Sequence, residues 1–223
     1  MSGKQEAEGW AETVRRYGEG NALTYEEIGG INPKDGPVAL CVGGANRLTG
    51  QLTEGFWGSS CDADEKEVGG LFGKALVPTA ILAKAHMPDL AEVVPAFNVE
   101  SIEGHEAVAQ RFSRKVEFES IDFNRRFWAT VPKEYDPVAL RELFSPGFLG
   151  WVTTMTGEID FGVNDRQLWF LWRVHERSGE ELMAALKNAG ELFKRLQGEM
   201  DESGIQTYPP GPWHAGLEPF PQA

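Results

Sequence analysis

The stretch Ile159-Asp-Phe-Gly-Val-Asn-Asp-Arg-Gln-Leu-Trp-Phe-Leu-Trp-Arg-Val174 is the part of the sequence that best defines the fold. Apolar residues alternate through its first half, Asn164-Asp165 provide a turn, and its second half is almost continuously apolar. This pattern predicts a β-hairpin. Successive strand residues point to opposite faces, and the return strand is apolar on both, so we expect a central strand covered on both sides.

Helical patterns lie on either side of this hairpin in the sequence. Residues 6–17 place Trp10, Val14 and Tyr17 at helical spacing, which predicts an N-terminal helix. Ser178 and Glu181 form a capping box, which indicates where a second helix begins. The residues that follow form one apolar stripe, made of Leu182, Leu186, Ala189, Phe193 and Leu196. This stripe predicts a long C-terminal amphipathic helix.

The middle of the chain alternates short strands and short helices. Residues 23–57 form glycine-punctuated β-like runs, including a strand over 38–42, and 58–74 are expected to form a glycine- and acid-rich loop. Asp136-Pro137 and Ser145-Pro146 are helix starts, which predict short helices over 138–144 and 147–155. Strand-like segments are expected over 116–119 and 122–131, and 79–87 suits a strand or a helix equally. The fold class expected is α+β, with a mostly antiparallel sheet.

Length and composition predict one domain with a tail. The chain has 223 residues, of which 41% are apolar, so it can bury a core without a metal or disulfide framework. Residues 1–198 are expected to form a single domain. Five of the 13 prolines lie after residue 198, which predicts a flexible tail over 199–223. Its aromatic side chains are candidates for contact with a protein partner, namely Tyr208, Trp213 and Phe220.

Charge and targeting signals limit the classes of function. The net charge of −13 argues against a nucleic-acid-binding protein, which must neutralise phosphates with Lys and Arg. The sequence has no secretory signal and no apolar run of about 20 residues, so we expect a cytoplasmic protein without a membrane span. In that compartment Cys41 and Cys61 are expected to stay reduced rather than form a disulfide.

The usual catalytic and metal-binding motifs are missing from the sequence. Residues 68–75 lack the first glycine and the hydroxyl residue of a phosphate loop, and the histidines lack metal-ligand spacing, so neither a cofactor nor a metal is predicted. The most reactive-looking stretch is Ser59-Ser60-Cys61, between a glycine and an aspartate. A hydrolase using Ser59, Ser60 or Cys61 requires a histidine brought near by folding. Acidic neighbours favour the neutral thiol of Cys61.

The segment Glu119-Ser-Ile-Asp-Phe-Asn-Arg-Arg-Phe127 is the most unusual combination of residues. As a strand, it would place Arg125 between two phenylalanines on one face, at least half buried. A buried guanidinium needs a partner, and the candidates are the carboxylates of Glu117, Glu119 and Glu158. The alternative is a ligand site in which Asn124, Arg125 and Arg126 hold a small anion.

This segment resembles an uncharacterised bacterial family, related to a larger domain of unknown function, whose members usually carry an E-S-x-x-F-N-R-x-F motif. The matching residues are Glu119, Ser120, Phe123, Asn124, Arg125 and Phe127. Weaker matches follow in the family's order, at 48–50, 87–90, 145–151 and 168–172. The resemblance covers roughly 10–196 and implies an α+β domain. Members usually have a membrane anchor before this domain, which we do not expect here, and the family implies no activity.

These observations favour a non-enzymatic binding or assembly module over an enzyme, because a well-patterned core accompanies missing catalytic motifs. Its expected partner is another protein or a second copy of the chain. The alternatives are the hydrolase that uses Ser59, Ser60 or Cys61, and a carrier of a small anionic ligand through Arg125 or Arg126.

Overall fold

A computed structural model describes residues 3–27, 41–53, 56–65, 79–86, 94, 96–102, 113–164, 167–174 and 177–204. Within them, nine strands form one sheet in the order β1-β2-β3-β4-β9-β8-β5-β7-β6, and each neighbouring pair is antiparallel. The strands are β1 (Thr24–Glu26), β2 (Cys41–Thr53), β3 (Phe56–Glu65), β4 (Thr79–His86), β5 (Phe97–Ser101), β6 (Ser113–Val116), β7 (Phe127–Pro132), β8 (Ile159–Asn164) and β9 (Gln167–Val174). The predicted α+β class is confirmed.

The described part of the chain also forms five helices. They are α1 (Gly3–Gly20), α3 (Ile121–Arg126), α4 (Pro137–Leu143), α5 (Pro146–Thr154) and α6 (Gly179–Glu202). The predicted caps are confirmed, because side chains of Asp136, Ser145 and Ser178 each accept a hydrogen bond from a backbone N–H in the first turn. Proline at the first position of α4 and α5 loses no hydrogen bond there, since that N–H is unpaired in any helix.

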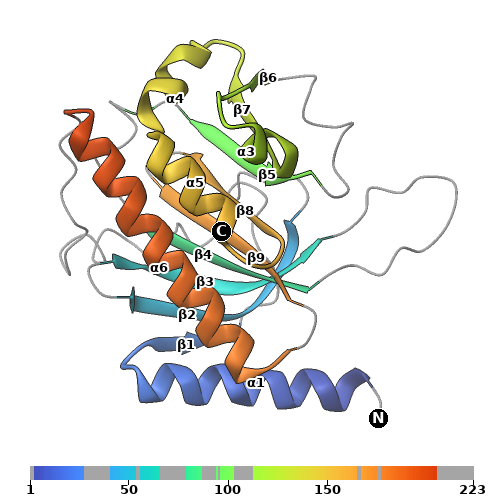
Figure 1. The fold of residues 1–223 in the computed structure, drawn as a ribbon. Helices are drawn as coiled ribbons and strands as arrows, with labels where there is room; N and C mark the ends of the chain where they lie inside the picture. Colours follow the sequence, from blue (N-terminus) through green and yellow to red (C-terminus); the bar gives the residue numbers. More distant parts are fainter. Residues whose placement is uncertain are drawn as a thin grey trace, which may run out of the picture.

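The helices lie against one face of the sheet, which we call the helix face. Figure 1 shows α6 and α5 running across this face, with α1 beside β1 at one end of the sheet and α3 and α4 at the other. The main core includes the apolar stripe of α6, Trp10 and Val14 of α1, and the helix-face residues of the strands. At the closest approach of α6 to β2, a Cβ atom on Gly190 would lie 2.7 Å from the Thr53 side chain.

The predicted hairpin is the centre of the sheet. Strands β8 and β9 pair from Ile159↔Trp172 to Asn164↔Gln167, and β9 also pairs with β4 along its whole length. From Leu168 to Val174 every side chain of β9 is buried, so the prediction of a strand covered on both faces is confirmed. Its helix-face residues join the main core, while Trp169 and Leu171 join a second cluster with Ala80 and Leu82.

Several boundaries differ from the sequence prediction. The glycine- and acid-rich segment predicted as a loop is strand β3 over Phe56–Glu65, and 66–74 lie outside the described residues. The segment left open between strand and helix is strand β4. Strand β2 continues through Gly43 and Gly44, past the predicted strand end at residue 42, and β6 ends at Val116 rather than at 119.

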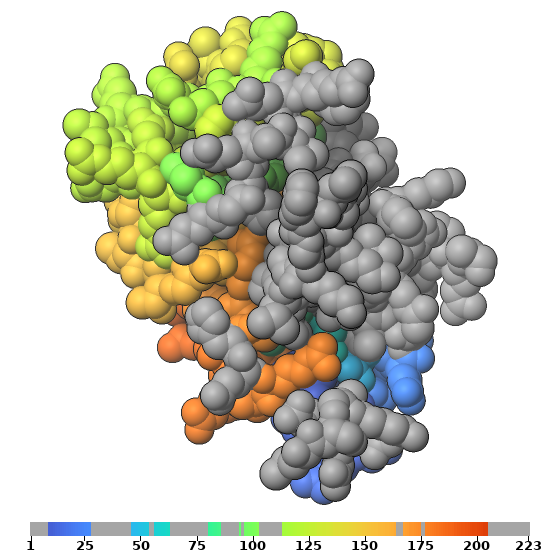
Figure 2. All heavy atoms as spheres, turned by 90° about the vertical axis from the view of Figure 1, so that its right-hand side faces the viewer, coloured from blue at the N-terminus to red at the C-terminus, as the bar shows by residue number. Residues whose placement is uncertain are grey.

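Helix α6 continues past the predicted domain boundary at 198. It ends at Glu202, because Met200 still belongs to the buried stripe and Gly198 meets no neighbouring atom that would break the helix. Figure 2 shows the molecule from the side, with the yellow-green residues of β6 and α3 near one end and the blue residues of α1 at the other. Among the helices of the described residues, none is long and apolar enough to cross a membrane.

Candidate functional site

The F-N-R segment forms a short helix that fixes its own surroundings. Residues 121–126 are helical and only Phe127 begins a strand, so the prediction of one strand over 122–131 is wrong in its first half. The Ser120 side chain caps the helix by accepting a hydrogen bond from Phe123 N–H. The Asn124 side chain donates to Phe118 C=O at 2.6 Å and accepts from Phe118 N–H at 3.1 Å. Asn124 therefore holds the backbone of Phe118 in place through two hydrogen bonds.

The two arginines of this segment have different surroundings. Arg125 is not buried between phenylalanines, because its side chain is 77% exposed and its nearest carboxylate is that of Asp122 at 4.0 Å. The predicted partners Glu117, Glu119 and Glu158 are therefore wrong, since the helical turn directs Arg125 outward. The Arg126 guanidinium donates to Thr153 C=O at 2.7 Å and Gly157 C=O at 2.9 Å. Asn124 and Arg126 thus have structural partners, and Arg125 lies in solvent.

The three residues proposed as nucleophiles lie on opposite faces of β3. Ser60 lies on the helix face, while Ser59 and Cys61 lie on the other face, where Cys61 contacts the second apolar cluster. Cys61 is not part of a disulfide bond. In the β3–β4 register, Ser59 is paired with Lys84, and these two residues are 6% and 5% exposed. The structure therefore places a buried lysine opposite Ser59.

A buried polar network joins α1 to the sheet. Asp62 Oδ2 accepts hydrogen bonds from Trp10 Nε1 and from Asn46 Nδ2, both at 2.7 Å. Asn46 has a φ of 55° and lies in a bulge of β2, between the pairs Ala45↔Asp62 and Leu48↔Ser60. Asparagine tolerates this left-handed conformation, and the bulge turns its amide toward Asp62. The sequence predicts a loop at Asp62, whereas the residue is buried in strand β3.

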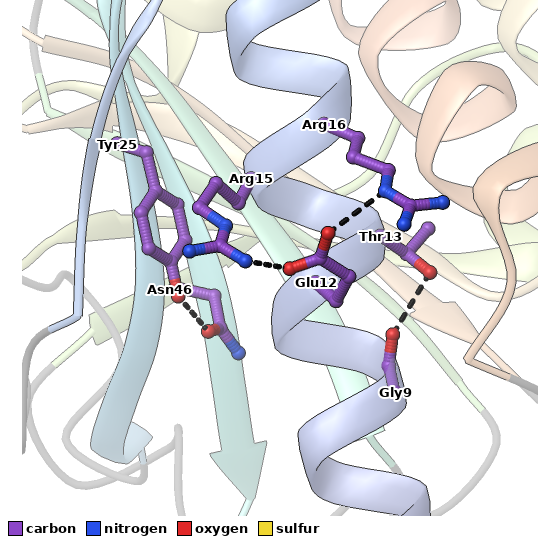
Figure 3. A network of polar contacts seen from close by, with 7 residues as sticks. All are labelled: Gly9, Glu12, Thr13, Arg15, Arg16, Tyr25 and Asn46. Carbon is purple, nitrogen blue, oxygen red and sulfur yellow. Dashed lines mark hydrogen bonds and ion pairs between the residues drawn. The ribbon is translucent and has the colours of Figure 1, made fainter.

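The same network reaches the protein surface through Tyr25. Its hydroxyl donates to Asn46 Oδ1 at 2.8 Å, and Figure 3 shows Arg15 of α1 beside this contact. Burial raises the pKa of Tyr25 above its ordinary value of 10.0; the charge of Glu27 adds to the rise, and Arg15 opposes it. The Arg15 and Arg16 side chains are both held by Glu12 (Figure 3). These contacts explain how α1 is attached to the sheet.

The sheet face opposite the helices, which we call the polar face, carries the strongest candidate site. The nine described residues that are polar or charged and buried include five on this face: Ser59, Lys84, Thr130, Asp160 and Arg173. The residues that alternate with the last four belong to the main core, and Ser59 is paired with Lys84, which places all five on the side away from the helices. Burying charged groups is costly unless they are paired, so such a cluster is typical of functional sites as well as of structural ion pairs.

One part of the polar face holds neighbouring strands together through a buried ion pair and a hydrogen bond. Arg173 Nη2 and Asp160 Oδ2 form an ion pair at 2.7 Å, with both side chains 4% exposed, and Glu158 lies 3.8 Å from Arg173 Nε. The other oxygen of Asp160 accepts from Ser101 N–H at 2.8 Å. This carboxylate therefore connects β5, β8 and β9, and both of its oxygens have partners.

A second part of the polar face has donors without acceptors. Trp169 and Trp128 lie on β9 and β7, and within the described chain neither Nε1 atom finds a hydrogen-bond acceptor. The Trp169 indole lies over Gly162 of β8, where a Cβ atom would be 2.9 Å from Nε1. Lys115 Nζ lies 4.7 Å from the centre of the Trp128 ring. This region can therefore offer hydrogen bonds to a molecule that carries acceptors.

The polar face was missed in the sequence analysis, although two signals for it exist. Lys84 and Arg173 each interrupt an apolar strand pattern, and a charged residue inside a buried strand requires a partner. Among the described residues, no group of three or more His, Cys, Asp or Glu side chains is placed to hold a metal. The predicted partner-binding residues Tyr208, Trp213 and Phe220 lie outside the described residues.

Comparison with known proteins adds no further assignment. No protein-family model matches the chain, and searches of curated proteins and of solved structures find no significant match. The resemblance carried by the E-S-x-x-F-N-R-x-F segment therefore stays a prediction. What the structure adds to it is a role for four of the six matching residues, since Ser120, Phe123, Asn124 and Phe127 serve the local fold.

Proposed function

We propose that this protein is a non-enzymatic binding module that holds its ligand against the polar face of the sheet. The observation that supports this proposal is the set of buried charged and polar residues on the polar face. The buried residues of the described helices pack on the other face of the sheet. A purely structural face would be cheaper to build from apolar residues, because ion pairs can be replaced by well-packed hydrophobic side chains without loss of stability.

Lys84 is the residue through which this proposal is best tested. It lies between Ser59 and Trp169 in the sheet register and is 5% exposed. A thermal-shift screen with a panel of small metabolites would compare the unmodified chain with Lys84→Met and with Lys187→Met, which removes an exposed lysine of α6. We expect some compounds to raise the Tm of the unmodified chain and of Lys187→Met by the same amount. The same compounds should raise the Tm of Lys84→Met by a smaller amount.

Two outcomes would contradict the binding module. One is a panel in which no compound raises the Tm of the unmodified chain. The other is an equal rise in all three proteins, which would place the ligand elsewhere. Because Lys84→Met can lower the basal Tm, Ser59→Ala serves as a second variant on the same row of the sheet.

A hydrolase is the second candidate function, and the pairing of Ser59 with Lys84 favours it. Side chains directly opposite on antiparallel strands have Cβ atoms about 5 Å apart. A serine beside a lysine is one of the nucleophile–base pairs that acyl-transfer enzymes use, with the lysine accepting the hydroxyl proton during attack on a carbonyl carbon. This arrangement replaces the histidine that the sequence analysis required.

Labelling with a fluorophosphonate, which modifies activated serines, separates the hydrolase from the binding module. The neighbouring Ser60 is a matched control because it lies on the helix face. The hydrolase predicts labelling that Ser59→Ala abolishes, Lys84→Met slows and Ser60→Ala retains. An unlabelled native chain, or labelling that survives Ser59→Ala, would exclude it.

A protein partner, or a second copy of the chain, and a cytoplasmic location remain part of our proposal. The acidic composition and the aromatic tail residues Tyr208, Trp213 and Phe220 support a partner contact. Affinity purification with the full chain and with a Tyr208→Ala, Trp213→Ala, Phe220→Ala triple variant tests the tail. Identical sets of bound proteins would remove the tail from this proposal.

A further inference from the structure

We infer that the ligand of the polar face carries a carboxylate or phosphate group, bound by the indole N–H groups of Trp169 and Trp128. This inference rests on the proposed binding module and names the chemistry of its ligand. It depends on the positions of five neighbouring strands, on a glycine that lies beneath one indole, and on two buried donors without acceptors.

A row of residues runs straight across the polar face. In the sheet register Trp169 is paired with Gly162, Gly162 with Asn98, and Asn98 with Thr130, which in turn is paired with Lys115. Because neighbouring strands lie about 4.8 Å apart, the whole row from β9 to β6 spans about 20 Å, and its central part is comparable to a small metabolite.

Gly162 brings the Trp169 indole close to the sheet. A Cβ atom at this position would lie 2.9 Å from Trp169 Nε1 and 2.1 Å from the carbonyl oxygen of Phe97, so a larger residue does not fit. The indole Nε1 therefore lies over Gly162 of β8, whose partner on the next strand is Asn98. Trp169 is 1% exposed, so bulk water does not take the place of the missing acceptor.

The two indole donors define the ligand. Trp169 lies at the β9 end of this row, and Trp128 lies beside the row on β7, where it is paired with Glu100. Trp169 Nε1 and Trp128 Nε1 are buried and find no acceptor within the described chain. An indole N–H donates only, so its partner must be an acceptor, and a buried donor left unpaired is costly. Two cations lie on the same face: Lys115 Nζ lies over the Trp128 ring and is also ion-paired with Glu117 at 2.9 Å, and Lys84 is paired with Trp169 in the sheet register. Donors and cations together favour an anionic oxygen group.

The test uses the indole N–H signals of the 15N-labelled full chain in two-dimensional NMR spectra. The sequence has seven tryptophans, and the signals of Trp169 and Trp128 are assigned from Trp169→Phe and Trp128→Phe. Succinate and inorganic phosphate are added in separate titrations at constant ionic strength, with sodium chloride as a third. The Trp10 signal is an internal control, because its N–H is already bonded to Asp62 at 2.7 Å.

The expected result is a saturable downfield shift of the Trp169 and Trp128 signals with one apparent Kd, while the Trp10 signal stays in place. Succinate and phosphate distinguish a carboxylate ligand from a phosphate ligand. Trp169→Phe should weaken binding about tenfold, because one hydrogen bond to a charged group is lost. Trp151→Phe, on the helix side of the sheet, should leave the affinity unchanged.

Each other outcome overturns the inference. If neither anion moves the two signals, the buried donors are satisfied by something else, such as an ordered water. If sodium chloride moves them equally, the site has no preference for an oxygen anion. A further outcome is that a neutral or cationic compound raises the Tm in the metabolite screen while neither anion shifts the two indole signals. That outcome supports the binding module and contradicts the inference that its ligand is an anion.

Discussion

Replacing Asp62 with alanine is the most informative test of how α1 is attached to the sheet. The Asp62 carboxylate accepts from Trp10 Nε1 and Asn46 Nδ2 at 2.7 Å each, and all three residues are less than a tenth exposed. Hydrogen bonds to a charged acceptor contribute about 1.5–3 kcal/mol each, and their loss leaves two buried donors unpaired. Asp62→Ala should therefore lower the free energy of unfolding by about 3–5 kcal/mol.

Urea unfolding followed by far-ultraviolet circular dichroism measures this loss without relying on tryptophan fluorescence. Asp122→Ala is the matched control, because that aspartate is 84% exposed and surface substitutions usually change stability by less than about 0.5 kcal/mol. A double-mutant cycle of Asp62→Ala with Trp10→Phe isolates one of the two hydrogen bonds, with an expected coupling of about 1.5–3 kcal/mol.

Two results would refute the reasoning about this network. If Asp62→Ala costs no more than Asp122→Ala, the carboxylate does not hold α1 in place. If the coupling between Asp62 and Trp10 is near zero while each single change is costly, the two residues act separately and the short distance between them carries no net energy.

Three further predictions concern packing, capping and pH. Gly190→Ala should destabilise the protein by about 1–3 kcal/mol in urea, because its Cβ atom would lie 2.7 Å from Thr53, whereas Gly198→Ala meets no atom and should be neutral or stabilising. Ser120→Ala should cost about 1 kcal/mol through loss of the α3 cap, measured in the same way; an unchanged midpoint would contradict the cap. Because burial raises the pKa of Tyr25, its contribution to stability is complete below pH 10.0 and is lost as pH rises through the raised pKa; Tyr25→Phe should therefore flatten the alkaline fall in Tm, and an unchanged slope would exclude this residue as its cause.

The parts of the fold that could be predicted are those where one local pattern acts alone. The hairpin of β8 and β9 follows from alternation and a turn, and α6 follows from a capping box and an apolar stripe. Strand β3 could not be recognised, because its glycines and acids are typical of loops. In the structure these residue types have specific uses: a Cβ on Gly58 would lie 1.8 Å from Lys84 C=O, and Asp62 is the acceptor for α1.

The F-N-R segment shows how one spacing can support two structures. Phe123 and Phe127 share a face in a strand, and four residues apart they also share a face in a helix. The signal that decides between the two is Ser120 followed by Asp122, an N-cap and an acidic first turn. A helix that begins at this signal directs Arg125 to solvent and Arg126 to the end of α5, as the structure has them.

The polar face depends on register, which no single segment of the sequence contains. Lys84 and Trp169 are 85 positions apart in the sequence and become neighbours only because β4 pairs with β9. In the same way, Gly162 gains its importance from the indole above it and the carbonyl oxygen of Phe97 beside it. A charged residue in an apolar strand can indicate that a partner exists, but not which one. Candidate binding residues in an antiparallel sheet therefore have to be sought in rows across the strands as well as in motifs along the chain.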